Sequence, residues 1–382
     1  MKKVTALFAL AGFALVLLSG CAGKDNTLPP APLTEFKPTL RVEPLWSTNI
    51  GKGSRKYYLR MTPAISGNTV FADNYDGDVV ALEAQTGKTI WQANAHTNLT
   101  SGVTAADGKL LVGSENGTVI AFDQATGARL WVAPVGSQIL AAPVIAKGMV
   151  LVKSMDGILD ALSETDGRQL WRFTQDVPAL SLHAESQPAV SGNVVVAGFS
   201  NGKTIGLNLQ TGQLLWSVDV SESKGMTDIE RMIDVDATPV IVGSVVYVGT
   251  YQGNIAAIGL QSGRLIWRHE ISTYSGIAAD AKNLYVSDAK SYVWGFDQDV
   301  GAVLWRQDHL QGRMISGPAL SDGYVVVADG YGYVHWMTKS EGQFAARVQV
   351  SDAGATVPPV IANHLVLVYT RDGKLYAFRE MI

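Results

Sequence analysis

Short runs of apolar residues alternate with turn residues along most of the chain. Residues 69–72, 150–153, 194–197 and 245–248 are rich in β-branched and aromatic residues, and an Asp-Gly, Asn-Gly or Gln-Gly pair follows each run. Asp-Gly and Asn-Gly favour tight hairpins, because both central positions of a type I′ turn need φ > 0. No unit shows an apolar stripe with the 3.6-residue period of a helix. The pattern therefore predicts an all-β protein of short antiparallel strands.

The same unit recurs along the chain. A segment that begins with Gly and ends with Trp closes six of the units, at Trp91, Trp131, Trp171, Trp216, Trp267 and Trp305. In each unit a turn lies 14 residues before the Trp, and a Pro, Val or Ile lies 14 residues further back. A seventh copy ends at Ala346, and an eighth begins at Pro359 but stops at Ile382 without its Trp. Four short strands in about 40 residues are typical of a propeller blade.

The two ends of the repeat array complement each other. The eighth unit contains three predicted strands, whereas residues 41–46 read as a fourth strand that no unit precedes. Pairing the N-terminal strand with the last blade removes two open sheet edges at once. The sequence thus predicts an eight-bladed β-propeller of four-stranded antiparallel blades over residues 40–382, with the ring closed by the N-terminal strand.

The repeated tryptophans are predicted to pack between neighbouring blades, each burying an area worth a few kcal/mol. These inter-blade residues are Trp46, Trp91, Trp131, Trp171, Trp216, Trp267 and Trp305. Small residues are expected to make room for the indoles, at Ala81, Ala121, Ala161, Gly206, Ala257 and Gly295. Unit seven has Trp336 at the small position and Ala346 at the Trp position, which we interpret as volume compensation.

The N-terminal segment reads as a secretory signal. Lys2 and Lys3 precede an apolar stretch over residues 4–18, which is too short and wrongly flanked for a stable membrane span. Leu-Ser-Gly-Cys follows and is similar to a bacterial lipobox, in which the cysteine, here Cys21, is acylated after cleavage. An ordinary signal peptide with an incidental cysteine is the alternative. Acylation with three chains would hold the protein permanently at a membrane surface.

The residues after Cys21 predict where and how the protein is held. Ala22 follows the cysteine, whereas a signal for retention in the inner membrane usually has Asp there, so the outer membrane is favoured. Residues 22–44 carry five prolines among small polar residues, a composition typical of a semi-rigid, extended spacer. We therefore assign residues 1–20 to a signal peptide and residues 21–39 to the lipid anchor and tether.

Composition excludes several classes of function. The 382 residues carry a net charge of −4, and 47% are hydrophobic, which argues against wholesale disorder and against a nucleic-acid binder with a basic patch. A single cysteine excludes an intramolecular disulfide framework and any cysteine-based metal cluster. The six histidines show no metal-ligand spacing, and neither His-Glu-x-x-His nor Gly-x-Ser-x-Gly occurs. We predict no catalytic residue, no metal and no cofactor.

Length varies only in the connections between units. Three connections, which end at Pro63, Pro188 and Pro239, span 17, 17 and 23 residues, against 10 to 13 in the others. They should lie on the same face as the Asp-Gly turns, and the second and third should form one neighbouring surface. Loops on a rigid scaffold commonly carry recognition. The first connection is basic through Lys52, Arg55, Lys56 and Arg60, which a solvated loop explains adequately.

The second and third long connections hold the candidate binding residues. Leu180 and Leu182 alternate around Ser181 and are either exposed anchors or a lid on the core, the lid being favoured by composition alone. Asp234 and Asp236 flank a valine, and carboxylates at i and i+2 point the same way from an extended strand. They could serve as acid and base, as half a metal site or as receptors for Arg or Lys; hydrogen bonding to nearby turn amides is equally favoured.

Two family resemblances complete the interpretation. The unit Ala-Leu-x-x-x-Thr-Gly-x-x-x-Trp resembles the repeat of quinoprotein alcohol and glucose dehydrogenases, whose eight-bladed propellers bind pyrroloquinoline quinone with calcium. Many of those enzymes use vicinal cysteines, which this chain with its single Cys cannot supply. The repeat therefore predicts the fold, and a periplasmic dehydrogenase dependent on pyrroloquinoline quinone is an alternative function.

The second resemblance covers essentially the whole chain. Lipobox, tether, repeats and off-repeat segments together resemble the BamB family, lipoprotein subunits of the machinery that assembles β-barrels in the outer membrane. In that family a Leu-Ser-Leu-Arg and an Asp-Val-Asp segment bind the periplasmic POTRA domains of the central barrel subunit, BamA. The matching positions are 180–182 and 234–236, and Arg231 also fits. His183 stands where the family commonly has Arg, so it lacks a permanent charge and a bidentate donor.

The resemblance implies a non-catalytic scaffold at the outer membrane that faces the periplasm. Leu180 and Leu182 would be apolar anchors, Asp234 and Asp236 would accept partner cations or backbone amides, and Cys21 would carry the lipid. A periplasmic holdase that captures unfolded barrel proteins by edge pairing is a further alternative.

Overall fold

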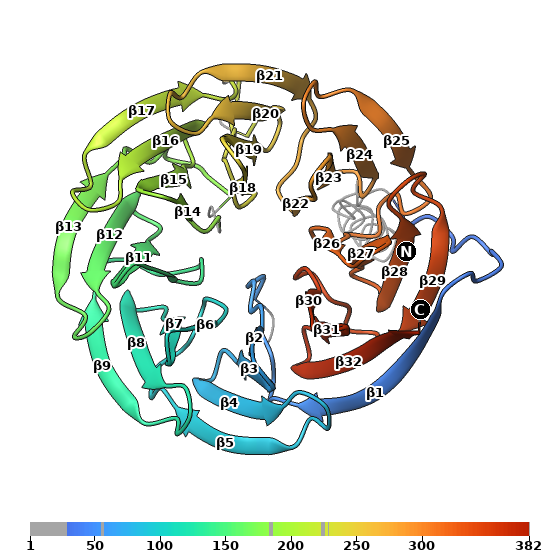
Figure 1. Cartoon of the computed structure of the whole chain (residues 1–382), viewed down its shortest axis with the longest axis horizontal. Coiled ribbons are helices and arrows are strands. Elements are labelled where there is room, and N and C mark those ends of the chain that lie inside the picture. The colour runs from blue at the N-terminus through green and yellow to red at the C-terminus, as the bar shows by residue number, and fades with distance from the viewer. Residues whose placement is uncertain (1–28, 55–56, 183–185, 223–225, 228, 382) are drawn as a thin grey trace, which may run out of the picture.

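The computed structural model describes residues 29–54, 57–182, 186–222, 226–227 and 229–381. Cys21, the expected signal peptide and His183 lie outside the described residues. The described residues form eight four-stranded sheets, arranged as blades around a ring (Figure 1). The predicted eight-bladed β-propeller is therefore confirmed. Within the described part, no helix is long and apolar enough to span a bilayer.

The first four blades run in chain order from inner to outer strand: β2 (Ala64–Ser66), β3 (Thr69–Asp73), β4 (Asp78–Glu83), β5 (Thr89–Asn94); β6 (Thr104–Ala106), β7 (Lys109–Gly113), β8 (Thr118–Asp123), β9 (Arg129–Pro134); β10 (Val144–Ala146), β11 (Met149–Lys153), β12 (Ile158–Ser163), β13 (Gln169–Thr174); β14 (Ala189–Ser191), β15 (Val194–Gly198), β16 (Lys203–Asn208), β17 (Leu214–Asp219).

The other four blades are β18 (Val240–Val242), β19 (Val245–Gly249), β20 (Asn254–Gly259), β21 (Leu265–Glu270); β22 (Gly276–Ala279), β23 (Asn283–Ser287), β24 (Val293–Asp297), β25 (Val303–Gln307); β26 (Ala319–Leu320), β27 (Tyr324–Ala328), β28 (Tyr333–Thr338), β29 (Phe344–Gln349); β30 (Val360–Ala362), β31 (Leu365–Tyr369), β32 (Lys374–Met381), β1 (Arg41–Asn49). Only the eighth blade takes its outer strand from the start of the chain.

The core lies between blades rather than inside any one of them. The middle strands, such as β15 and β16, are buried almost throughout, because each blade packs on a neighbour with both faces. One cluster joins Leu151 and Leu159 of blade three to Val195 and Leu207 of blade four. The outer strands alternate between exposed and partly buried residues because one side meets solvent. This packing explains why the middle strands read as continuous apolar runs.

Each repeated tryptophan contacts the turn of the following blade. The Trp91 indole donates to the Gln124 carbonyl at 3.1 Å, and a Cβ atom on Gly127 would lie 2.6 Å from Trp91 Cε3. Gly127 also has a φ of 72°, a region that favours glycine. The Thr-Gly turn is thus shaped to receive an indole. The same contact joins Trp46 to Gly87, Trp131 to Gly167, Trp171 to Gly212, Trp216 to Gly263, Trp267 to Gly301 and Trp305 to Gly342.

The small residues lie opposite the tryptophans of their own blade. Ala81 pairs with Trp91, and a Cβ atom on Gly206 would lie 2.2 Å from the ring of Trp216. In blade seven the two sizes are exchanged, since Trp336 pairs with Ala346. Trp336 is fully buried and donates to Glu380 of blade eight at 2.8 Å. This exchange supports the interpretation as volume compensation across the strand pair.

The N-terminal strand closes the ring as predicted. β1 pairs antiparallel with β32 from Arg41, opposite Met381, to Asn49, opposite Lys374. A bulge between Pro44 and Trp46 shifts the register, as bulges beside the outer strand do in the other blades. This pairing brings the first and the last strand of the chain, β1 and β32, together in one blade (Figure 1).

The tether differs from the expected free spacer. The Thr39 and Leu40 amides donate to the Ala345 carbonyl at 2.9 and 3.1 Å, and the ring of Phe36 stacks on Phe344 at 5.4 Å between centroids. Residues 41–44, included in the expected spacer, belong to β1. Proline-rich composition indicates an extended backbone, and an extended backbone can also lie along the edge of a blade.

We expect Gly127→Ala to destabilise the propeller more than Gly108→Ala. Both glycines have φ near 72°, so both changes carry a backbone cost of about 1–2 kcal/mol. No atom lies within 4 Å of a Cβ on Gly108, whereas Gly127 would clash with Trp91 and lose about 1–3 kcal/mol more. Chemical denaturation followed by circular dichroism measures the difference. Equal losses would show that the indole contact does not limit the packing of blades.

Candidate docking surface at the channel mouth

The three long connections lie on one face of the propeller. The Tyr75 amide, next to an Asp-Gly turn, donates to Gly53 of the first connection at 3.1 Å. At the start of the second connection, the Gln175 amide donates to the carbonyl of Gly157 in an Asp-Gly turn at 2.9 Å. At the start of the third, the Val220 amide donates to the carbonyl of Gly202 in an Asn-Gly turn at 3.2 Å. The expected placement on the side of the Asp-Gly turns is therefore confirmed. We call this side the mouth face.

The second and third connections contact each other directly. The Leu182 amide donates to Asp234 Oδ1 at 2.9 Å. Farther along, the Ser186 hydroxyl donates to the Val235 carbonyl at 2.9 Å, and the Gln187 amide donates to Thr238 Oγ1 at 3.2 Å. The two segments that carry the predicted binding residues thus form one continuous structure.

Asp234 is a buried support for the second connection. Its side chain has no exposed area, and burial raises its pKa to about 6, an effect that the nearby charge of Asp236 increases and the Leu182 amide opposes. The neighbouring Val235 is fully buried and packs closely against Gly198 of β15, since a Cβ atom on Gly198 would lie 2.3 Å from Val235 Cγ1. This contact holds the segment in place. Asp234 is therefore held deep beneath the surface, with its carboxylate turned to a backbone amide.

Asp236 is paired with the first connection. Its Oδ2 lies 3.2 Å from Nη2 of Arg60, which also donates to the Tyr274 carbonyl. The Arg60 side chain is 20% exposed and that of Asp236 is 6% exposed. The basic composition of the first connection suggested that Arg60 is a solvated loop residue. Instead, Arg60 links the first connection to the third. Sequence reasoning missed this role because 176 residues separate the partners.

These positions correct the expected role of the acidic pair. Asp234 and Asp236 were expected to accept partner cations or backbone amides. Both carboxylates are buried and accept hydrogen bonds from groups of this chain, Asp234 from a backbone amide and Asp236 from Arg60. The equally favoured interpretation, bonding to nearby amides, describes Asp234. Burial of a carboxylate requires such partners, because an unpaired charge away from water is costly.

The apolar residues are divided between surface and cavity. Leu180 is 42% exposed, so it is not a lid on the core, whereas Leu182 is half-buried and lines a cavity. Arg231 is exposed on the third connection. The same connection exposes Met226 by 90% and Ile229 by 64%, two residues that sequence reasoning missed although they lie three apart outside the repeat. We call Leu180, Leu182, Met226, Ile229 and Arg231 the docking surface.

The cavity lies at the mouth of the central channel and has a volume of about 650 Å³. All three long connections contribute to it, through Tyr57 to Arg60, Leu182 and Asp236. Tyr251, Tyr274, Met155 and Met314 make the rest of the wall largely aromatic and apolar. Among the described residues, no group of three or more His, Cys, Asp or Glu is placed to hold a metal ion.

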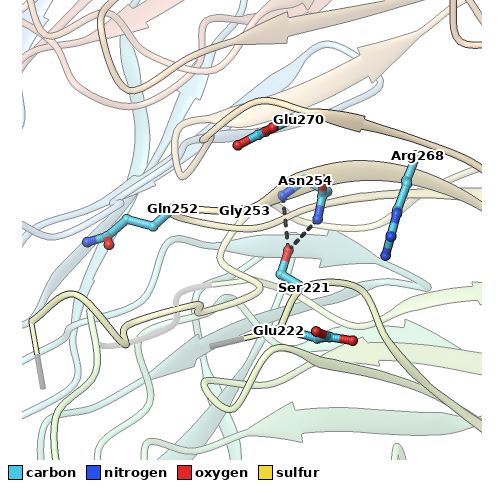
Figure 2. A pocket seen from close by; sticks show the side chains of 7 residues that line it. All are labelled: Ser221, Glu222, Gln252, Gly253, Asn254, Arg268 and Glu270. Carbon is cyan, nitrogen blue, oxygen red and sulfur yellow. Dashed lines mark hydrogen bonds between the residues drawn. The ribbon is translucent and has the colours of Figure 1, made fainter. Parts of the chain in front are cut away.

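A polar hollow adjoins the third connection. It has a volume of about 340 Å³ and is lined by Ser221, Glu222, Gln252, Gly253, Asn254, Arg268 and Glu270 (Figure 2). The Ser221 hydroxyl accepts hydrogen bonds from the Asn254 amide and from Asn254 Nδ2, at 3.0 and 3.1 Å. Gln252 Nε2 donates to the Ile229 carbonyl at 3.1 Å, which joins this hollow to the docking surface. A polar rim beside exposed apolar residues is typical of protein interfaces.

The raised pKa of Asp234 predicts a pH dependence of stability. A carboxyl with a pKa of about 6 in the fold and about 4 when unfolded binds more protons when folded, so its contribution to stability falls as pH rises from 4 to above 6. Asp234→Asn keeps an acceptor for the Leu182 amide but cannot ionise. We expect the variant to gain stability relative to the unmodified protein over that interval. Parallel curves of unfolding free energy against pH would contradict this expectation.

Comparisons with known proteins agree with this architecture. A family model described as outer membrane protein assembly factor BamB matches residues 75–303 and 289–380. The chain is 44% identical to the BamB of Pseudomonas aeruginosa over 370 residues, 97% of each chain. It is 35% identical to that of Escherichia coli K12 over 377 residues, 95% of this chain and 96% of the relative.

Solved structures show the same fold. BamB from Moraxella catarrhalis superposes with a TM-score of 0.81 at 24% identity, over 89% of this chain and 100% of that chain. A europium-containing methanol dehydrogenase has a TM-score of 0.72 at 13% identity, over 88% of this chain and 93% of that chain, a likeness of fold alone. Sequence similarity at full length therefore distinguishes among propellers of one shape, and the chain belongs to the BamB family of outer membrane protein assembly factors.

Proposed function

We propose that this chain is a non-catalytic scaffold lipoprotein that docks on the periplasmic POTRA domains of a BamA-like barrel subunit and aids insertion of outer-membrane proteins. One observation carries the proposal: the connections that depart from the repeat converge on one face and leave apolar side chains exposed there. Met226 and Ile229 are 90% and 64% exposed three residues apart on one connection, and grouped exposed apolar residues mark interaction sites. Family membership supports the same assignment.

The residues of the docking surface have different roles in this proposal. Leu180 is the exposed anchor, and Leu182 presents its half-buried side chain at the channel mouth. Asp234 fixes the Leu182 backbone, and Asp236 fixes Arg60, so both acidic residues act through the loops that they hold. Arg231, which is exposed on the third connection, supplies a polar contact, and His183, which lies outside the described residues, is a candidate for another.

The lipid anchor belongs to the same proposal. Cys21 is the acylated residue, and it holds the propeller at the outer membrane on the periplasmic side. Stable anchoring at a membrane needs two lipid or basic signals. Three acyl chains exceed that number, so the attachment is permanent. A permanent anchor confines the propeller to the membrane where its partner is embedded.

The first test replaces one exposed leucine. We expect Leu180→Asp to reduce recovery of the BamA-like subunit at least about tenfold, equivalent to about 1.4 kcal/mol, because a charge would be buried at an apolar contact. Leu130→Asp is the matched control, since Leu130 is 48% exposed on the outer strand β9, away from the mouth face. Affinity purification from detergent-solubilised envelopes measures recovery. Equal recovery with both variants would remove Leu180 from the interface.

The second test separates support from direct binding at Asp234. Asp234→Asn retains an oxygen for the Leu182 amide, whereas Asp234→Ala removes it. If Asp234 acts through the loop, the Asn variant keeps recovery of the partner and the Ala variant loses it, while both stay folded by circular dichroism. Loss of recovery in both variants would indicate that the partner binds the carboxylate itself.

A further inference from the structure

The segment before β1 is bound along the outer edge of blade seven. The Ala31 amide donates to the Gln311 carbonyl at 2.8 Å, and at the other end Leu40 donates to Ala345 at 3.1 Å. Figure 1 shows this part of the chain passing outside β29 before it enters β1. We call residues 31–40 the latch.

Two arginines bind main-chain carbonyls of the latch. Arg313 Nη1 donates to the Ala31 carbonyl at 3.1 Å, and Arg347 Nη1 donates to the Thr34 carbonyl at 2.9 Å. The Arg347 guanidinium also lies 5.0 Å from the ring centroid of Phe36. Charged donors to carbonyls form stronger hydrogen bonds than neutral donors. The latch is therefore held by its backbone, by the ring of Phe36 and by the buried side chain of Leu40.

A buried cluster positions these arginines. Asp329 accepts from Arg313 Nε at 2.7 Å and lies 2.9 Å from His335 Nε2, while Arg347 Nε donates to His335 Nδ1 at 3.2 Å. Burial lowers the pKa of His335, which keeps the ring neutral so that it accepts from Arg347 and donates to Asp329. The other blades have no equivalent set among the described residues, so the cluster is specific to the blade that binds the latch.

The two ends of the latch lie at opposite faces of the propeller. Gln311 and Arg313 belong to the connection between blades six and seven, where Gly330 in the turn of blade seven donates to the Arg313 carbonyl at 3.0 Å. Ala31 is therefore at the mouth face. Arg41 begins β1 at the far end from Asn49, which pairs with Lys374 beside the turn on the mouth face. The latch thus carries the chain across the full height of blade seven.

We propose that the latch fixes the point where the lipid-anchored chain leaves the propeller and thereby holds the mouth face toward the membrane. This inference rests on the proposed anchor at Cys21. Ten residues from Cys21 to Ala31 span at most about 36 Å, so the rim of the mouth face at blade seven stays near the bilayer. Without the latch the chain would leave at Arg41, on the opposite face, with a reach of about 70 Å.

The test measures energy transfer from the protein to lipid headgroups. The acylated full-length protein is placed in phosphatidylethanolamine and phosphatidylglycerol vesicles that contain an acceptor-labelled lipid. Asp352→Cys places a donor dye on the mouth face, and Glu341→Cys places it on the opposite face of the same blade; both sites are exposed. Because acylation uses the only natural cysteine, each dye is unique. We expect at least twofold higher transfer efficiency at position 352.

Variants of the latch test its role. Phe36→Ala combined with Ala31→Pro removes the stacked ring and the amide donor to Gln311, and it should abolish the difference between the two dye positions. Lys37→Ala is the matched control, since Lys37 is exposed in the same segment, and it should keep the difference. Circular dichroism verifies that each variant is folded.

Each outcome decides between the proposals. Acylated protein with equal transfer at both positions, or with a difference that survives loss of the latch contacts, would overturn the latch and leave the anchor intact. Mass spectrometry that finds no acyl chains on Cys21 would overturn the anchor and, with it, this inference.

Discussion

The contact between an indole and a glycine turn of the next blade determines the rest of the structure. Trp91 and Gly127 show its two parts: a hydrogen bond from the indole to a turn carbonyl, and a ring that occupies the place of the missing side chain. Because this contact recurs at seven seams, the distance from turn to tryptophan cannot vary within a blade. Insertions are tolerated only in the connections, and the docking surface is built from the longest of these.

The seam between blades seven and eight is the exception and is built differently. Among the described residues, blade eight has no Thr-Gly turn to receive an indole, because its outer strand is β1, which does not follow β32 in the chain. Instead, Trp336 on β28 of blade seven donates a hydrogen bond to Glu380 of blade eight. Leu40 packs in the same cluster as Trp336 and Phe378. The latch leads directly into this cluster, so the segment that we propose orients the propeller also covers the seam between blades seven and eight.

The fold could be predicted from the sequence because its signals are local and repeated. Asp-Gly turns, β-branched runs and the missing eighth tryptophan together specified the blades and the closing strand. The latch could not be predicted, since proline-rich composition is the same in a free spacer and in a bound one. Its contacts depend on Arg313 and Arg347, about 300 residues away, and these are ordinary arginines in the sequence.

The candidate site was predicted in position but not in mechanism. The spacing of Asp234 and Asp236 indicates that they point the same way, but it cannot say that Leu182 and Arg60 lie there to meet them. Their burial has a consequence for recognition. Asp234 holds the second connection through Leu182, and Asp236 holds the first through Arg60, so the leucines of the second connection keep their places only while the internal bond to Asp234 persists. Binding of a partner to this surface therefore depends on the structure of three connections at once. A substitution at a buried carboxylate can abolish binding although that carboxylate makes no contact with the partner.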